Sequence, residues 1–331
     1  MQETNEAPPQ CILFPGESKI GLRQDNKLFF FKAGTVQVES SYTFPFTVLF
    51  FSLPVQNVIL VVDESRPNTL LLWNHHTSSI ENSLDFESNI TNLICTRNFA
   101  SVVIKTSTTI VKIKPFSVYQ AITTTNPIPT FSIINLPTDN NHCTYAYPDE
   151  SKPTSVIIST IPSSDDSIII DAHKNKISCL ALSQDAKYLV TASDYGTIVR
   201  LWDAKTGKFI HESRRGWTSA TIIHFSFSPL SNFLCISSSH GTIHVCKIDK
   251  SSNEGNWLIP KADISVNIRR DNEMIQLNRF QAFVEDDTNL MCCVTESGHC
   301  IVYEIDLDKG NATMKTKFKL DKIMKLTNSN V

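Results

Sequence analysis

Residues 171–216 constrain the fold of this chain more than any other stretch, because four short strand-forming runs follow one another there. The second run, residues 188–193, alternates its side chains between two faces, as expected of a half-buried strand. Gly196 then lies in a tight turn, where glycine can adopt a positive φ. The third run ends in Trp202-Asp203, and a fourth run follows. Four strands in about 40 residues with this ending are typical of one β-propeller blade of the WD-repeat type.

Comparable groups of strand-forming runs recur along the 331 residues. Repeat folds can extend over a chain of this length as one domain. We therefore predict an all-β fold in which residues 1–331 form one seven-bladed β-propeller. Closure of the ring requires the terminal strands to pair, and the sequence does not show which strand does so. The expected blades are approximately residues 10–40, 46–86, 90–123, 129–171, 175–213, 220–280 and 281–320. Residues 321–331 are expected to form a flexible tail, and a pair of packed sheets is the structural alternative.

Composition and charge argue against several other classes of protein. The formal net charge of −3 does not favour nucleic-acid binding, so any anion site must be local. The nine cysteines are scattered and form no CxxC pair, which favours a reducing, cytosolic compartment. The N-terminus lacks the apolar core of a signal peptide. Residues 44–62 are apolar but interrupted by prolines, so we interpret them as two buried strands rather than a membrane span.

An adjacent arginine pair, Arg214 and Arg215, directly follows the fourth run. Successive side chains on a strand point to opposite faces, so an extended chain directs one guanidinium toward its own blade and the other toward the next. A guanidinium presents a fork of donors that matches phosphate oxygens, and Gly216 leaves backbone room beside the pair. The pattern indicates two anion pockets, and a solvated pair that forms ordinary salt bridges is the alternative.

Four stretches resemble the PROPPIN family of phosphoinositide-binding propellers, which includes the animal WIPI proteins. They are AHKNKISCLALS (172–183), YLVTASDYGTIVRLW (188–202), SRRG (213–216) and FSFSPLSNFLCISSSHGTIHV (225–245). Weaker similarity in LLWN (71–74) and HCTYAYP (142–148) extends the resemblance over residues 10–310, although only residues 171–246 carry it specifically. The chain departs from the family at Ser213, where the family has Phe or Leu, and at Tyr195 and His240, where it often has Lys. The loss of those lysines implies weaker binding.

The resemblance implies a non-enzymatic protein of cytosolic membrane faces that binds phosphatidylinositol 3-phosphate and phosphatidylinositol 3,5-bisphosphate. It further implies a peripheral location on autophagosome-precursor, endosomal or vacuolar membranes and an effector role in autophagy or in endosomal and vacuolar traffic. An autophagy lipid-transfer protein is the implied protein partner. No cofactor is expected.

Residues suited to binding phosphate and inositol hydroxyls surround the arginine pair. We predict one pocket on blade five and one on blade six. The blade-five pocket is expected to contain His173, Ser193, Thr197, Arg200 and Arg214, and the blade-six pocket Arg215, Ser219, Ser238, Ser239, His240, Thr242 and His244. Thr197 and Thr242 both follow a glycine, which predicts a repeated design.

Two of these residues have alternative interpretations. His173 could belong to the buried network of WD repeats with Ser193 and Trp202, but Tyr195 stands where that network has an aspartate. Arg200 could be a solvated strand residue.

Residues 249–272 interrupt blade six and contain an apolar centre, Trp257, Leu258 and Ile259, followed by the basic residues Lys261, Arg269 and Arg270. Tryptophan prefers the membrane interface, and flanking basic residues favour anionic lipid. The resemblance implies that this loop inserts into bilayers. The alternative is a surface loop whose tryptophan packs against the propeller.

Enzymatic functions find no support in the sequence, which contains no HExxH, GxSxG, P-loop or GxGxxG motif. The competing hypothesis is a WD-repeat scaffold that binds proteins and not lipid. A test of binding to liposomes with and without the 3-phosphate lipid distinguishes the two.

Overall fold

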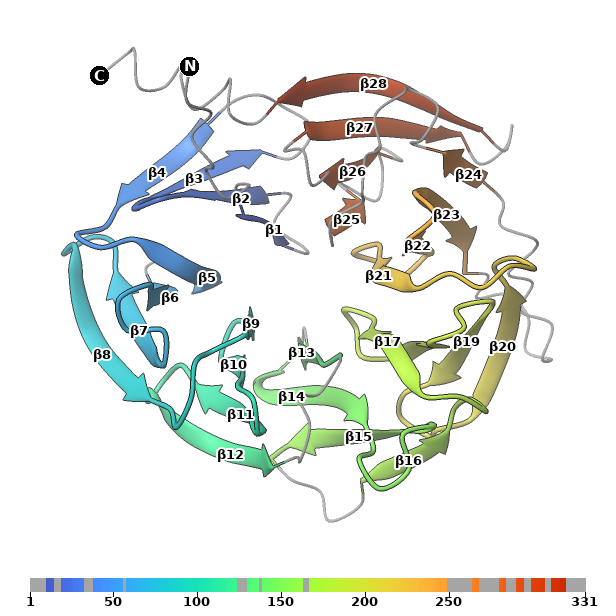
Figure 1. The fold of residues 1–331 in the computed structure, drawn as a ribbon, viewed down its shortest axis with the longest axis horizontal. Coiled ribbons are helices and arrows are strands. Elements are labelled where there is room, and N and C mark those ends of the chain that lie inside the picture. Colours follow the sequence, from blue (N-terminus) through green and yellow to red (C-terminus); the bar gives the residue numbers. More distant parts are fainter. Residues whose placement is uncertain are drawn as a thin grey trace.

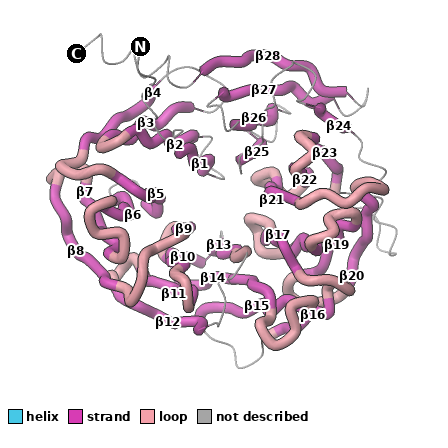
Figure 2. The backbone as a smooth tube through the Cα atoms, in the orientation of Figure 1, coloured by secondary structure: helices cyan, strands magenta, loops and turns pink. Residues whose placement is uncertain are grey.

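The computed structural model of this chain describes residues 10–14, 19–32, 38–55, 58–123, 130–136, 139–162, 167–248, 264–267, 280–283, 290–294, 299–306 and 311–319. These residues form 28 strands and no helix. Seven four-stranded sheets are arranged like blades around a central axis (Figure 1), and the described connections between strands are loops and turns (Figure 2). The predicted all-β, seven-bladed propeller is confirmed.

Each sheet consists of four consecutive strands of the chain, paired antiparallel in chain order. The first blade contains β1 (Gln10–Phe14), β2 (Lys19–Gln24), β3 (Lys27–Lys32) and β4 (Val38–Thr43). The second contains β5 (Val48–Val55), β6 (Val58–Asp63), β7 (Thr69–Asn74) and β8 (Ser79–Asp85). The third contains β9 (Asn92–Cys95), β10 (Phe99–Val103), β11 (Ser107–Lys112) and β12 (Ser117–Thr123). Residues 44–62 thus contribute to two sheet strands, β5 and β6, as expected.

The remaining blades have the same organisation. The fourth contains β13 (Ser132–Leu136), β14 (Asp139–Pro148), β15 (Ser155–Ile161) and β16 (Ile168–Asp171). The fifth contains β17 (Ile177–Leu182), β18 (Tyr188–Ser193), β19 (Ile198–Asp203) and β20 (Phe209–Arg214). The sixth contains β21 (Ile222–Phe227), β22 (Phe233–Ser238), β23 (Thr242–Lys247) and β24 (Ile264–Asn267). The seventh contains β25 (Phe280–Phe283), β26 (Leu290–Val294), β27 (His299–Asp306) and β28 (Asn311–Lys319).

Burial changes from the middle to the edge of each blade. The second strands β6, β18 and β22 are buried along their whole length. The outer strands β8 and β28 are exposed over most of theirs. The expectation that residues 188–193 form a half-buried strand is therefore wrong. Each blade has a neighbour on both sides, so both faces of its middle strands are covered.

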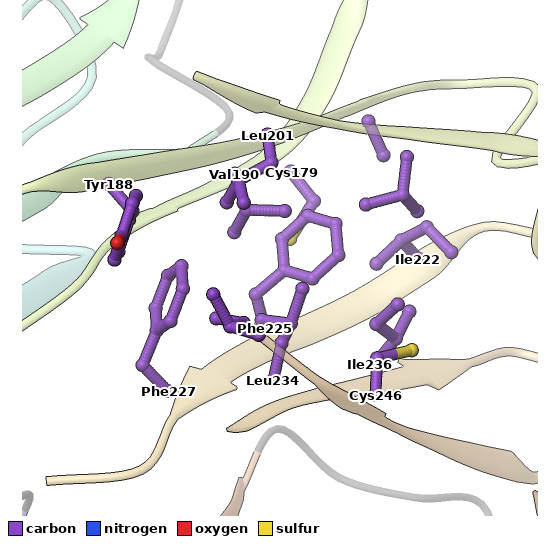
Figure 3. Packing of buried hydrophobic residues seen from close by; sticks show 13 residues of the cluster. Cys179, Tyr188, Val190, Leu201, Ile222, Phe225, Phe227, Leu234, Ile236 and Cys246 are labelled. Atoms are coloured by element: carbon purple, nitrogen blue, oxygen red, sulfur yellow. The ribbon is translucent and has the colours of Figure 1, made fainter. Parts of the chain in front are cut away.

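Blade five packs against its two neighbours with alternate residues. Toward blade six it directs Cys179, Tyr188, Val190 and Leu201, which meet residues of β21, β22 and β23 (Figure 3). Toward blade four it directs Leu180, Leu182, Leu189 and Trp202, which join apolar side chains of blade four. Burial of each large apolar side chain contributes roughly 1.5–3 kcal/mol. This alternation determines which face of blade five each polar residue occupies.

Two features of the sheets differ from expectation. The described strands pair only within contiguous blades, so no terminal strand completes a sheet at the other end of the chain. Blades one and seven instead meet at their inner strands β1 and β25 (Figure 1). The predicted loop of residues 249–272 is interrupted by β24, which pairs with β23. The sequence pattern did not reveal β24 because it has only four residues, Ile264–Asn267.

The eight cysteines from Cys95 to Cys300 form no disulfide bond, and seven of them are buried. A buried cysteine without a disulfide packs as a small apolar residue. Among the described residues no helix is long and apolar enough to cross a bilayer.

The turn between β18 and β19 lies directly against the connection from β20 to β21. Gly196 in that turn has a φ of +60°, and a Cβ atom there would lie 1.8 Å from the carbonyl oxygen of Ala220. The Ala220 amide also donates a hydrogen bond to the Tyr195 carbonyl at 3.2 Å. Glycine is therefore required at position 196 both for its backbone conformation and for this close approach.

We predict that Gly196→Ala lowers the free energy of unfolding by at least about 1–2 kcal/mol, because the left-handed conformation is unfavourable for alanine. The clash with Ala220 adds to this cost. Gly216→Ala is the matched control, since a Cβ atom there meets nothing within 4 Å, and its effect should stay within about 0.5 kcal/mol. Thermal melting of both variants tests this, and a wild-type melting temperature for Gly196→Ala would contradict it.

Candidate functional site

The arginine pair lies where β20 ends, and its two side chains belong to opposite faces of blade five. Arg214 is the last residue of β20 and pairs with Ile198 of β19, two positions from the pair formed by Glu212 and Arg200. Arg200 is two residues from Trp202, which packs toward blade four, so Arg214 shares the blade-four face. Arg215 follows on the other face, toward blade six.

The side chain of Arg214 is exposed and stacks on an aromatic ring. Its guanidinium carbon lies 4.7 Å from the ring centroid of Trp217. Stacking uses the flat face of the guanidinium and leaves its in-plane N–H donors directed outward. Arg214 can therefore contact an anion that approaches from solvent.

Arg200 occupies the same face but is already held by protein groups. Its Nε and Nη2 atoms lie 2.9 and 2.8 Å from the same carboxylate oxygen of Glu212, and Nη1 donates to the Ala172 carbonyl at 2.6 Å. The sequence alone allowed Arg200 to be either a hydrogen-bond donor to phosphate or a solvated strand residue. In the structure its guanidinium is instead held by Glu212 and Ala172. Glu212 balances its charge, and the Ala172 carbonyl fixes its direction.

His173 belongs to a buried hydrogen-bond network of the WD type. Its Nε2 atom lies 3.0 Å from the hydroxyl of Thr191, which also accepts a hydrogen bond from the Trp202 indole at 2.9 Å. The sequence suggested Ser193 as the hydroxyl of such a network, but the structure has Thr191 in that place. Burial, with a smaller contribution from the charge of Arg200, lowers the pKa of His173 to about 4.

Arg215 is fixed between the two loops at this edge of the propeller. Nε donates to the Gly196 carbonyl at 2.7 Å, and Nη2 donates to the Thr218 carbonyl at 2.6 Å. Its backbone amide donates to the Thr197 carbonyl at 2.9 Å. These contacts orient a partly buried guanidinium toward blade six, and burial lowers its pKa.

Blade six contributes a row of polar residues that faces Arg215. Ser238, Thr242 and His244 share their face with Ile236 and Cys246, which pack toward blade five. The hydroxyls of Ser238 and Thr242 lie 3.1 Å apart, and the Thr242 hydroxyl lies 3.5 Å from Nε2 of His244. Burial and the charge of Arg215 lower the pKa of His244.

The other predicted residues lie at the rim or within the sheet. Ser219 and Ser239 are exposed, His240 is partly buried, and Ser193 is buried at the end of β18. Trp257, Leu258 and Ile259, the proposed membrane-inserting residues, lie outside the described residues.

The repeated design predicted from the two Gly-Thr pairs has a different register from the one expected. Arg200 pairs with Thr191, two residues before the end of β18, and His244 pairs with Ile236, two residues before the end of β22. Arg200 and His244 are therefore structural equivalents. Thr242 begins β23, whereas Thr197 precedes β19. One additional residue in blade five shifts Thr197 out of the equivalent position.

Sequence reasoning missed Glu212, Thr191 and Trp217. The pairing of Glu212 with Arg200 could have been found by counting outward from the turn at Gly207, although a bulge between Leu201 and Trp202 shifts that count by one. The signal for Trp217 was its position two residues after the arginine pair.

Comparisons with known proteins agree on the family and the fold. A family model described as PROPPIN matches residues 19–257. Autophagy-related protein 18 from Dictyostelium discoideum is 38% identical over 117 residues, which are 35% of this chain and 31% of that protein. The match thus spans less than a third of that relative.

Two solved structures superpose on nearly the whole chain. Kluyveromyces lactis Hsv2 has a TM-score of 0.78 at 15% identity and covers 94% of this chain and 99% of its own. The structure described as a complex of KlAtg21 with the coiled coil of AgAtg16 has a TM-score of 0.71 at 18% identity, again covering 94% of this chain and 99% of that one. At these identities the likeness shows the propeller fold.

The lowered pKa of His173 predicts a specific loss of stability in acid. The folded protein keeps this histidine neutral down to a pH of about 4, whereas the unfolded chain protonates it below about 6.5. Its contribution to stability is therefore complete above pH 6.5 and is lost progressively as the pH falls toward 4. Between pH 6 and 5 the loss should be about 1 kcal/mol.

Chemical denaturation of wild type and His173→Asn at pH 7, 6 and 5 measures this loss. The variant is less stable at every pH but should lose less stability on acidification. Lys174→Asn, at an exposed neighbouring position, should follow the wild-type dependence. Parallel pH profiles for wild type and His173→Asn would show that this imidazole is not the titrating group.

Proposed function

This chain belongs to the PROPPIN family, and we propose that it is a peripheral membrane protein that binds phosphatidylinositol 3-phosphate and phosphatidylinositol 3,5-bisphosphate through two sites that flank Arg214 and Arg215. The observation that carries this proposal is the divergence of two consecutive guanidinium groups. Arg214 leaves the backbone on the blade-four face of blade five and stacks on Trp217, and Arg215 is fixed toward blade six. Two separate cations beside hydroxyl and imidazole groups suit two phosphorylated headgroups.

In the first site Arg214 supplies the accessible charge. His173, Ser193, Thr197 and Arg200 complete the proposed set, and the ion pair of Arg200 with Glu212 makes Arg214 its dominant cation. His173 is neutral at physiological pH because its pKa is about 4. It therefore serves as a neutral hydrogen-bonding group that positions its neighbours.

In the second site Arg215 supplies the charge. Two carbonyl contacts hold its guanidinium, which reduces the entropy lost when phosphate binds. Its remaining N–H donors and the polar row of Ser238, Thr242 and His244 are the groups that we assign to phosphate and inositol oxygens. Ser219, Ser239 and His240 form the proposed rim. Because the pKa of His244 is lowered, Arg215 is the main positive group here as well.

The biological setting follows from the relatives. The similarity to Autophagy-related protein 18 supports an effector role in autophagy or in endosomal and vacuolar traffic, with binding to autophagosome-precursor, endosomal or vacuolar membranes. An autophagy lipid-transfer protein is the proposed partner. The structure described as KlAtg21 with the AgAtg16 coiled coil supports a protein-binding role, which another surface of this propeller could serve alongside lipid binding.

The two-site proposal predicts separable losses. Titration calorimetry with inositol 1,3-bisphosphate, the soluble headgroup, should detect two sites per wild-type chain. Arg214→Ala and Arg215→Ala should each retain about half of the binding capacity, because each lost charge-assisted contact costs roughly 1.5–3 kcal/mol at its own site. On vesicles either variant should bind far more weakly than wild type, since avidity contributes a factor of about 10²–10⁴.

Lys205→Ala is the matched control, because it removes one exposed positive charge from the turn that precedes β20, away from Arg214 at the end of that strand. It should bind headgroup and vesicles like wild type. If Arg214→Ala removed both sites while Arg215→Ala removed neither, a single shared pocket would replace the two-site arrangement.

The segment with Trp257, Leu258 and Ile259 is proposed to enter the bilayer. The double variant Trp257→Asp/Leu258→Asp should bind vesicles more weakly, because burial of each large apolar side chain contributes roughly 1.5–3 kcal/mol. Its affinity for soluble headgroup should be unchanged. A folded double variant that floats with vesicles as wild type does would exclude insertion of this segment.

A further inference from the structure

Two aromatic side chains are unusually exposed at the edge that carries the arginine pair. Trp217 is 87% exposed and Tyr195 is 59% exposed. Trp73 and Trp202, by contrast, are buried in blade interfaces. One exposed apolar residue is ordinary on a protein surface. Two large aromatic groups from different loops beside two arginines form a local surface that no role described above uses.

The two loops that carry these aromatic groups are fastened to each other. The Ala220 amide bonds to the Tyr195 carbonyl at 3.2 Å, and Arg215 donates to carbonyls on both loops, Gly196 and Thr218. Gly196 permits their close approach. Tyr195 and Trp217 are therefore presented on a rigid frame, which costs little entropy when they bind a surface.

The stacking of Arg214 on Trp217 limits what can cover this surface. The guanidinium lies 4.7 Å from the indole centroid, so whatever body carries a phosphate to Arg214 also approaches Trp217. If that phosphate belongs to a lipid, the approaching body is the membrane itself. Tryptophan and tyrosine prefer the interface between lipid headgroups and acyl chains, and arginine is attracted to anionic lipid.

We propose that Trp217 and Tyr195 form an aromatic anchor that enters the interfacial layer of an anionic bilayer while Arg214 and Arg215 hold the lipid phosphates. This inference rests on the proposed function. It assigns the turn between β18 and β19 and the connection between β20 and β21 as membrane-contacting segments in addition to residues 249–272. It also explains how binding can persist where Tyr195 and His240 replace the lysines common in the family: the aromatic groups supply apolar attraction in place of fixed charge.

The anchor is tested by comparing vesicles with soluble headgroup. Trp217→Ala and Tyr195→Ala are measured for binding to phosphatidylcholine vesicles that contain phosphatidylinositol 3-phosphate, and for binding to inositol 1,3-bisphosphate. Trp217→Ala should lower vesicle affinity about tenfold and headgroup affinity less than about twofold, and Tyr195→Ala should have a smaller effect of the same kind. Phe209→Ala, at an exposed aromatic residue 55% accessible at the other end of β20, should behave as wild type.

Each other outcome has a defined meaning. Unchanged vesicle affinity in Trp217→Ala with headgroup binding intact overturns the anchor, leaves the proposed function standing, and makes a protein the remaining occupant of this surface. An equal loss toward vesicles and headgroup also overturns the anchor, because Trp217 would then act only by orienting Arg214. If wild type binds neither probe, the proposed function fails and the anchor fails with it.

Fluorescence provides a direct readout of bilayer entry. In a Trp257→Phe background the exposed indole of Trp217 should shift its emission to shorter wavelength on vesicles with phosphatidylinositol 3-phosphate, and brominated lipid should quench it. Trp73 and Trp202 are buried and supply a constant background. Additional replacement of Trp217 by phenylalanine should abolish the shift and the quenching, and their persistence would contradict the assignment.

Discussion

Packing of each sheet against a neighbour on both sides is the interaction on which the rest of this structure depends. The second strands β18 and β22 are buried along their whole length, and a cluster of buried apolar side chains lies between blades five and six (Figure 3). Polar side chains that stay within the inner strands are hydrogen-bonded there, as Thr191 is to His173 and Trp202. Most of the residues proposed to bind phosphate lie near the ends of β18, β20, β22 and β23, at one edge of blades five and six.

This packing also determines on which face of blade five each arginine lies, because side chains alternate between the two faces along a strand. Val199 and Leu201 face blade six, while Trp202 faces blade four. The strand that carries Arg214 is registered on the same pattern, so the neighbouring arginines leave the backbone on different faces of blade five. Protein carbonyls fix Arg215, and an indole ring supports Arg214. The two proposed sites thus share one short segment of backbone but differ in how rigidly their cations are held.

The sequence was sufficient for the fold and for the divergence of the arginines, because both follow from period-two alternation and from turns at glycine. The sequence did not predict the hydrogen-bond and ion-pair partners of individual side chains, because these depend on which groups of neighbouring strands lie closest. Arg200 is neutralised by Glu212 across a bulged pair, and Thr191 rather than Ser193 bridges His173 to Trp202. The register of Thr197 depends on one additional residue in blade five. The exposure of Trp217 could not be predicted, since apolar composition alone suggests burial.

The assembly of every described sheet from one contiguous stretch of chain has a mechanical consequence. In a propeller that completes one blade with strands from both ends of its chain, the hydrogen bonds between those strands hold the ring closed. Here the boundary between blades one and seven is a seam, which can separate without breaking any strand pairing among the described residues. Under load or thermal motion the ring would open first at this seam. The contact between blades five and six is not part of this seam, so the two blades would keep their mutual geometry while the ring opens.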